Sequence, residues 1–313
     1  ETPNIDATNG IIHVVDAVIG LPTVVDHALA NNNSFGNLVA ALGAADGDLV
    51  TTLSTGGPFT ILAPDDDAFA TFLNGAALGD VPTDALANIL LNHVINNVVL
   101  TSSDLIAAES GYTNTLATGP ESTNLSIYFD ATDGVMFNGV SSVSTADIVG
   151  TNGIIHEVDA VIDLPTIATF ATSNLALEKL VEALAYADTG SPTVPYITTV
   201  SDAAAGPFTV FAPTNDAFAS LLADDLMEEN LTDIPTATVD AVLLMHIVNA
   251  NVQSGILSSG AVPTLGGEIT ADATAFTLTD ANGRVSNIIT SLVDIQAING
   301  VVHVIDKVIL PAL

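Results

Sequence analysis

Histidine is the residue in this sequence with the clearest capacity for chemistry, because imidazole binds metals and moves protons near neutral pH. His13, His156 and His303 each follow an Asn-Gly pair inside an alternating apolar run, which predicts a strand with one apolar face formed by Ile154, His156, Val158, Ala160 and Ile162 and their counterparts. His93 and His246 lie at helical spacing from apolar residues (Leu86 and Ile89, Val239 and Val242), which predicts helices.

A two-histidine metal site would require His93 and His156 to converge, and nothing in their spacing favours that over packing. A lone histidine on an apolar face is usually a hydrogen-bonded core residue. We therefore expect structural roles for these histidines and predict no metal site.

A run of carboxylates, Asp65 to Asp67, is the second candidate for chemistry, because calcium takes several oxygen ligands. The alternative is helix capping, since acidic residues accept the free N–H groups of a first turn and favour its dipole. The second half of the chain has Thr214 to Asp216 here, and the Asp, Gly and Glu positions of an EF-hand loop are absent. Capping is favoured, so we expect no cofactor, with calcium at most weakly bound.

An enzyme of the hydrolase class would need a nucleophile and a base in a cleft. The sequence has neither a Gly-x-Ser-x-Gly elbow nor a His-Glu-x-x-His motif. No carboxylate pair is marked by an apolar surround that would raise the pKa of one member, as glycoside hydrolysis requires. We expect that the chain is not an enzyme.

The segments that position these residues are repeated along the chain. An Asn-Gly-[Ile/Val]-[Ile/Val]-His pattern begins at Asn9, Asn152 and Asn299, at spacings of 143 and 147 residues. Two further patterns recur once each in the same order: Gly-Pro-Phe-Thr from Gly57 and Gly206, and Leu-Leu-x-His from Leu90 and Leu243. The chain therefore contains two copies of one domain.

The boundary between the copies is expected at a Leu-Pro-Thr sequence, found from Leu21 and again from Leu164. Proline disfavours helix in the residue before it, and threonine is a good N-cap. Domain one is then residues 22–164 and domain two residues 165–313. Residues 1–21 are a surplus closing strand that resembles the end of a preceding domain, and the simplest interpretation is two units from a longer tandem array.

Each domain is expected to be α+β, with helices early and strands late. Apolar residues at a spacing of three to four predict helices over 23–30 and 35–42, followed by a strand over 59–62. Later in each domain, Asp133-Gly134 and Asn282-Gly283 provide the positive φ angles that hairpins need. We expect these two turns to correspond.

Composition limits the classes of partner. The 313 residues carry 36 acidic and 3 basic side chains, a net charge of −33, so binding to nucleic acid or to an anionic membrane surface is excluded. Hydrophobic residues make up 49%, enough to form a core, and no run approaches ~18 uninterrupted apolar residues, so no membrane insertion by this segment is expected. Without cysteine, no disulfide framework is possible.

At these motifs the sequence resembles the fasciclin domain family. Phe208 to Phe218 reproduce the family's first motif, Phe-Thr-x-Phe-Ala-Pro-Thr-Asn-x-Ala-Phe, whereas Phe59 to Phe69 depart from it at Leu62, Asp65 and Asp66. The second motif, Asn-Gly-x-[Val/Ile]-His-x-[Ile/Val]-Asp, is matched three times, including the pairs Asn152-Gly153 and Asn299-Gly300. In the central Tyr-His element, Asn92 and Met245 replace the tyrosine.

The resemblance implies a compact α+β domain in which a wedge-shaped β-sandwich lies beside a bundle of short helices. Fasciclin-like proteins are secreted or surface-attached modules of cell adhesion and extracellular matrix, usually in tandem, and are not generally enzymes. In some animal matrix members an Asp-Ile pair just before the second motif is implicated in integrin binding. Asp147-Ile148 and Asp294-Ile295 occupy that place here and are the candidate binding residues.

The leading hypothesis is therefore a secreted, cell-surface adhesion or matrix module, with other extracellular proteins, polysaccharide or copies of itself as partners. The alternative is a structural subunit of a self-assembling extracellular filament. In that case chains would join head to tail through the surplus strand, because Gly10 to Ile19 duplicates Gly300 to Ile309. The unneutralised charge repels neighbouring units at low salt, so stability and self-association are expected to rise with salt or calcium.

Overall fold

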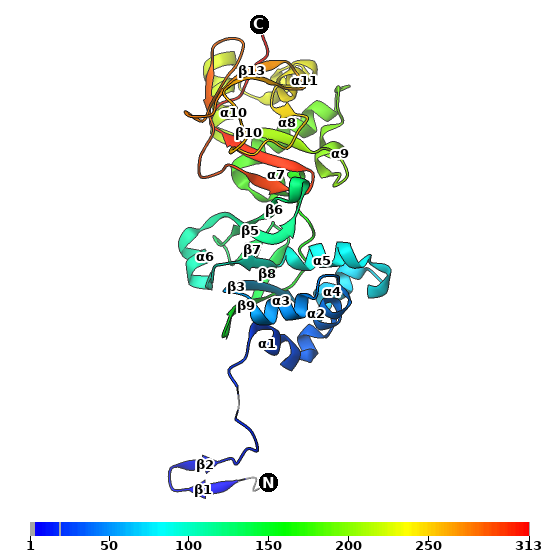
Figure 1. Ribbon diagram of the computed structural model, residues 1–313. Helices are drawn as coiled ribbons and strands as arrows, with labels where there is room; N and C mark the ends of the chain where they lie inside the picture. The colour runs from blue at the N-terminus through cyan, green and yellow to red at the C-terminus, as the bar shows by residue number, and fades with distance from the viewer. Residues whose placement is uncertain (1–3, 19, 313) are drawn as a thin grey trace.

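The computed structural model describes residues 4–18 and 20–312 and has the predicted mixed α+β architecture. Two domains follow one another, and a small hairpin stands apart at the N-terminal end (Figure 1). Among the helices of these described residues, none is both long enough and apolar enough to cross a bilayer.

Four helices of domain one begin at capping side chains: α1 (Val24–Ala30), α3 (Leu49–Thr55), α4 (Asp66–Leu73) and α6 (Ser102–Ala108). α1 follows Thr23, which forms a capping box with Asp26, and α4 follows Asp65. The other helices are α2 (Asn32–Ala44), η1 (Leu78–Asp80), α5 (Thr83–Leu91) and η2 (Pro120–Ser122). Both early helices predicted from the apolar spacing are confirmed, although α2 starts earlier than predicted and is kinked at Phe35.

The strands of domain one form a closed sheet. They are β3 (Phe59–Pro64), β4 (Val94–Asn96), β5 (Ser110–Thr118), β6 (Asn124–Asp130), β7 (Met136–Phe137), β8 (Ser141–Gly150) and β9 (Gly153–Val158). β3 and β9 are parallel, and the other neighbours are antiparallel. The long strands β5 and β8 each pair with strands of both layers, which joins the two layers of the expected sandwich at its edges.

Domain two has a similar order of elements. Its helices are α7 (Ile167–Ser173), η3 (Leu175–Leu177), α8 (Glu178–Asp188), α9 (Tyr196–Ser201), α10 (Asn215–Ser220), η4 (Leu221–Leu226), η5 (Leu231–Asp233) and α11 (Thr236–Leu244). Its strands are β10 (Phe208–Pro213), β11 (Ile247–Val248), β12 (Gly260–Pro263), β13 (Glu268–Asp272), β14 (Thr277–Thr279), β15 (Val285–Asn287), β16 (Ile295–Ala297) and β17 (Gly300–Ile305). They form two separate sheets, in the orders β11-β10-β17-β16 and β12-β13-β14-β15. Among the described residues of this domain, no helix lies between β11 and β12, and two strands, β15 and β16, take the place of β8.

The predicted correspondence between the two late turns is wrong. The Asn282-Gly283 turn joins β14 to β15, and the hydroxyl of Ser286 on β15 donates to the carbonyl of Lys307. In domain one the equivalent hydroxyl is that of Ser141 on β8, which donates to Ala160, and β8 follows the turn at Asn138-Gly139. The counterpart of Asn282-Gly283 is therefore the turn at Asn138-Gly139. The prediction failed because Asp-Gly and Asn-Gly pairs both favour hairpin turns, so the sequence alone does not show which of the two turns in domain one corresponds.

The two domains touch through a small set of specific contacts. The backbone N–H of Gln296 on β16 donates to the hydroxyl of Ser126 on β6 at 3.0 Å. The amide of Asn174 donates to the hydroxyl of Tyr112 at 3.0 Å. The Tyr112 ring stands edge-on to Phe170 of α7, with ring centres 5.6 Å apart, and Tyr112 also packs on Tyr128. An aromatic pair of domain one thus covers one end of domain two.

The N-terminal hairpin consists of β1 (Ile5–Ala7) and β2 (Gly10–Ile12). Its pairing places Ile5 opposite Ile12 and Ala7 opposite Gly10. Domain two has the same register between Ile295 and Val302 and between Ala297 and Gly300. In the described part of the chain, β2 pairs with β1 alone, and the hairpin stays apart from both domains (Figure 1).

Candidate functional site

The two histidines of the central element occupy equivalent buried positions. The backbone N–H of Ile162 donates to Nε2 of His93 at 2.8 Å, and Nδ1 donates to the carbonyl of Ile89 at 2.8 Å. In domain two, Ile309 and Val242 take these places around His246. Both ring nitrogens are therefore used, and burial lowers the pKa of His93 and of His246 to about 4.

These histidines lie beyond the helices predicted to carry them. α5 ends at Leu91 and α11 at Leu244, and each histidine stands in the turn that leads into the next strand. The helical conformation continues to the cap residue, Asn92 or Met245, so each ring still reaches the carbonyl four residues back. That geometry accounts for the helical spacing seen in the sequence.

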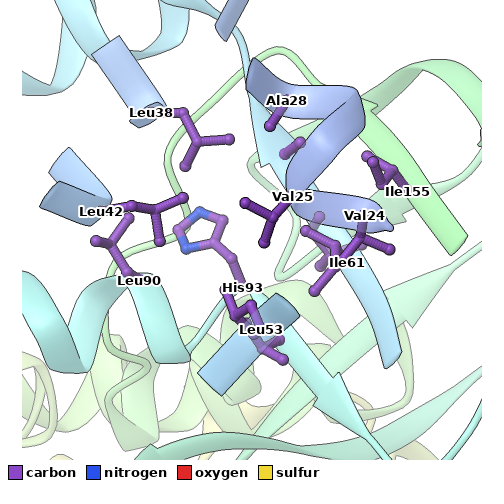
Figure 2. Close-up of a pocket in the computed structure, with 13 residues that line it drawn as sticks. Val24, Val25, Ala28, Leu38, Leu42, Leu53, Ile61, Leu90, His93 and Ile155 are labelled. Carbon is purple, nitrogen blue, oxygen red and sulfur yellow. The ribbon is translucent and has the colours of Figure 1, made fainter. Parts of the chain in front are cut away.

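Figure 2 shows His93 at the edge of an apolar cavity whose lining includes Val25, Leu42 and Leu90. The cavity has a volume of about 30 Å³, room for roughly one water molecule. A small-molecule site typically occupies about 300 Å³ or more. His93 therefore faces a packing defect of the core and has no substrate-sized space before it.

His156 and His303 connect strand to loop in the same way in both domains. Nε2 of His156 donates to the carbonyl of Leu100 at 2.8 Å, and Nδ1 accepts the backbone N–H of Asp147 at 3.4 Å. His303 does the same with Val252 and Asp294. Burial lowers the pKa of His303. The apolar face predicted around His156 is shorter than expected, because β9 ends at Val158, before Ala160 and Ile162.

The candidate binding aspartates are engaged inside their own domains. The Asp147 carboxylate accepts the backbone N–H of Ser102 at 2.9 Å and its hydroxyl at 2.5 Å. These bonds lower the Asp147 pKa. Asp294 holds Ser254 through the same pair of bonds. Both aspartates have positive φ, 62° and 57°, so each turns the chain into its last hairpin.

The isoleucines of the two Asp-Ile pairs differ in exposure. Ile295 is buried in the core of domain two, and Ile148 is partly buried against that of domain one. Asp294, with a third of its side chain exposed, also lines a polar groove between the domains together with Tyr112 and Asn114. A contact role for the two pairs stays a prediction, and the exposed edge of Asp294 is the part a partner could reach.

The asparagines of the second motif each fasten two distant backbone segments. Oδ1 of Asn152 accepts the N–H of Val24 at the start of α1, and Nδ2 donates to the carbonyls of Leu53 and Gly56 at the end of α3. Asn299 makes the matching bonds to Ile167, Val200 and Asp202. All side-chain hydrogen-bonding groups of these asparagines are used within the domain.

The glycines that follow are required by close strand approach. A Cβ atom on Gly153 would lie 2.3 Å from the carbonyl oxygen of Phe59, and one on Gly300 would lie 2.1 Å from that of Phe208. At Gly10, in the N-terminal copy, nothing lies within 4 Å of such an atom. His13 and Asn9 of that copy are exposed. The second motif therefore packs against a neighbouring strand in two of its three occurrences, and the N-terminal copy is exposed.

Two further buried residues with equivalent roles were not singled out from the sequence. The Thr60 hydroxyl donates to Val98 and accepts from Leu100, and Thr209 does the same with Ala250 and Val252. Thr60 and Thr209 are both fully buried. The sequence signal for them is the Phe-Thr pair, which recurs in the first motif of both domains.

The capping interpretation of the carboxylate run is confirmed for Asp65, which accepts the N–H of Ala68 at 2.7 Å. Asp66 accepts the N–H of Asn37, as Asn215 accepts that of Lys179 in domain two. Among the described residues, no group of three or more His, Asp or Glu side chains is placed to hold a metal ion.

Comparison with known proteins agrees with this repeated architecture. Human periostin is 27% identical over 84% of this chain and 28% of its own length. Protein sll1483 of Synechocystis sp. is 41% identical over 35% of this chain and 58% of its own length, so the chain spans only part of these relatives. A solved FAS1 domain pair from the insect cell adhesion molecule Fasciclin I covers 89% of the chain and 97% of the pair, with a TM-score of 0.54 and 18% identity, and shares the fold. The fasciclin domain model matches residues 33–165 and 177–311, and the chain belongs to the fasciclin domain family, with two domains in tandem.

Proposed function

We propose that the chain is a non-enzymatic, extracellular or cell-surface module that acts in adhesion or matrix assembly by surface recognition. The observation that carries the proposal is that the polar side chains of the repeated motifs hydrogen-bond within their own domains. Asn152, His93, His156 and Asp147, and their counterparts in domain two, hydrogen-bond to backbone groups of their own domain. Recognition is thereby left to the outer surface, and the solved relative named as a cell adhesion molecule supports that class.

The surface also favours partners that tolerate negative charge. Of the 3 basic side chains, Lys179 lies 2.7 Å from Glu182 and Arg284 lies 3.7 Å from Asp280. Neutral polysaccharide, other extracellular proteins and, at high salt, copies of the chain itself fit this surface. Nucleic acid does not.

The test is an adhesion measurement. Beads coated with the chain are washed at 0.5 M NaCl over surfaces coated with the chain, with neutral polysaccharide or with extracellular matrix protein. Retention above that of beads coated with an equally acidic albumin supports the proposal. Retention no greater than that of the albumin beads on all three surfaces, or turnover of chromogenic ester, phosphate or glycoside substrates, would overturn it.

We also propose domain limits of residues 22–164 and 165–313. α1 packs into the core of domain one through Val24, Val25 and Ala28. α7 packs into the core of domain two through Ile167 and Phe170. Separate expression of the two segments should give two folded proteins, and failure of either to fold without residues from the other would contradict these limits.

The alternative is a filament subunit, and the exposed hairpin favours it. Ile11 and Ile12 are 57% and 55% exposed, whereas Ile154 and Ile155 at the same positions of β9 are 2% and 1% exposed. A neighbouring chain could bury this hairpin by β-augmentation. If it does, sedimentation at 0.5 M NaCl will show polymers of the chain that disappear when residues 1–21 are removed.

A further inference from the structure

The end of domain one nearest the N-terminal hairpin exposes two positions, Val149 and His27, whose counterparts in domain two are buried. We refer to these two residues and the neighbouring Leu21 and Leu29 as the N-terminal face. Val149 pairs with Ile154, as Gln296 pairs with Val301, so the two residues are equivalent. Val149 is 71% exposed and Gln296 is 1% exposed.

A second position on this face differs in the same direction. His27 and Phe170 each lie four residues after the capping threonine of their helix. His27 is partly exposed, whereas Phe170 is fully buried. Leu21 and Leu29, beside these positions, are 82% and 52% exposed.

In domain two the equivalent face is covered by domain one. Tyr112 packs edge-on against Phe170, and Ser126 accepts the N–H of Gln296. The occupant of that face is therefore known in chemical terms: it is the β5–β6 surface of a fasciclin domain, with an aromatic pair at its centre.

The N-terminal hairpin supplies the second, independent observation. It has the register of the closing hairpin in both domains, yet it is exposed along its whole length. Gly10 of the hairpin precedes Val24, the first residue of α1, by 14 positions, and Gly153 of β9 precedes Ile167, the first residue of α7, by the same 14. A domain closed by β1 and β2 would be attached to the N-terminal face by the same length of chain that attaches domain one to domain two.

We propose that the N-terminal face docks a further fasciclin domain, the one whose closing hairpin is β1–β2, through an aromatic pair equivalent to Tyr112 and Tyr128. Domain two of a second copy does not fit this role. Its β12–β13 pairing places Ala261 opposite Thr270, where β5–β6 has Tyr112 opposite Tyr128. Covalent attachment favours the tethered domain further, because it supplies a high effective concentration against the mutual repulsion of acidic chains.

The test extends the chain by placing residues 22–146 directly before residue 4, so that β1–β2 follows a domain one body that lacks its own closing hairpin. Because the chain has no cysteine, Val149→Cys provides a single reporter for thiol labelling. We expect labelling to be about tenfold slower in the extended chain than in the 313-residue chain. Ile106→Cys, at a residue 56% exposed on α6 of the original domain one, is the matched control and should label equally in both.

Two variants of the extended chain separate closure from docking. Gly10→Ala should lower its thermal midpoint while leaving the 313-residue chain unchanged, since the new Cβ would meet a strand only when the hairpin is paired. Replacing the added copies of Tyr112 and Tyr128 by Ala and Thr should restore fast labelling at Val149→Cys. Equal labelling with and without the added segment, or after loss of the tyrosines, overturns the docking. A Gly10→Ala variant without effect in the extended chain overturns the hairpin's assignment.

Discussion

The side-chain oxygen of Asn152 accepts a hydrogen bond from the backbone N–H of Val24 at 3.0 Å, across 128 residues of sequence. The same asparagine donates to the carbonyls of Leu53 and Gly56, and so fixes the start of one helix against the end of another. In domain two, Asn299 repeats the arrangement with Ile167, Val200 and Asp202. The second motif is therefore a clamp between the closing hairpin and the helices that open each domain.

Asn152→Ala should destabilise domain one by about 3 kcal/mol, because three backbone groups lose their partner and Val24 is buried. Asn299→Ala should cost domain two at least as much, since Asn299 is 1% exposed. Urea unfolding monitored by circular dichroism measures both. Asn9→Ala, in the exposed copy of the motif, is the matched control and should change stability by less than ~0.5 kcal/mol. Equal effects at the three positions would contradict the clamp.

The glycine after each clamp gives a second prediction. Gly153→Ala and Gly300→Ala should each cost about 3 kcal/mol, because the Cβ atom would meet a backbone oxygen of the parallel partner strand at 2.3 or 2.1 Å. Gly10→Ala meets nothing within 4 Å in the 313-residue chain and should be close to neutral. Thermal midpoints of the three variants test the expectation, and a tolerated alanine at Gly300 would show that β10 and β17 separate easily.

The buried histidines predict how stability depends on pH. His93 and His246 have a pKa of about 4 in the folded protein, below the ordinary value of 6.5, because burial disfavours the charged form. The unfolded chain therefore takes up protons first as the pH falls. The contribution of these histidines to the free energy of unfolding should be fully present above pH 6.5 and should decline between pH 6.5 and about 4. Below about pH 4 these two residues should cause no further decline. The decline is on the order of 3 kcal/mol for each histidine.

The measurement is the free energy of unfolding at pH 7.5 and at pH 4.5 for the parent chain and for His93→Asn with His246→Asn. The double variant should be less stable at pH 7.5, since Ile162 and Ile309 lose their acceptors, yet should lose much less on acidification. Asn152→Ala, which is destabilised but retains both buried histidines, is the matched control and should keep the parent's pH dependence. An unchanged slope in the double variant would show that other groups control acid unfolding.

How much of this the sequence could predict depends on how local each feature is. The helix cap at Thr23 and the closing hairpins depend on residues only a few positions apart in the sequence. The repeated motifs also show which caps and hairpins correspond between the two domains. The partners of Asn152 lie 96 to 128 residues away, so its type and position did not reveal what it binds. Likewise, the sequence marked Asp147 as a candidate site, but its bonds to Ser102, 45 residues away, depend on the folded chain path.

The contact between domains was beyond prediction for a related reason. Tyr112 and Phe170 meet because domain one places its β5–β6 surface on α7, and no repeat pattern indicates which surfaces of two copies adjoin. Val149 and His27 stand out only when they are compared with their buried counterparts in domain two, Gln296 and Phe170. Differences in burial between equivalent residues of the two domains therefore indicate a docking surface that the motifs do not reveal.

The charge gives the last prediction, because 36 acidic and 3 basic side chains leave the surface strongly self-repelling. Raising NaCl from 10 mM to 0.5 M shortens the Debye length from about 30 Å to a few ångströms and should raise the thermal midpoint. We expect a rise on the order of 5 °C, which corresponds to roughly 1–2 kcal/mol for a domain of this size. Replacing the exposed Glu228, Glu229 and Glu268 by Lys should raise the midpoint at low salt and reduce the gain from added salt. If the midpoints of both proteins were the same at the two salt concentrations, surface repulsion would have no measurable share in the stability of these domains.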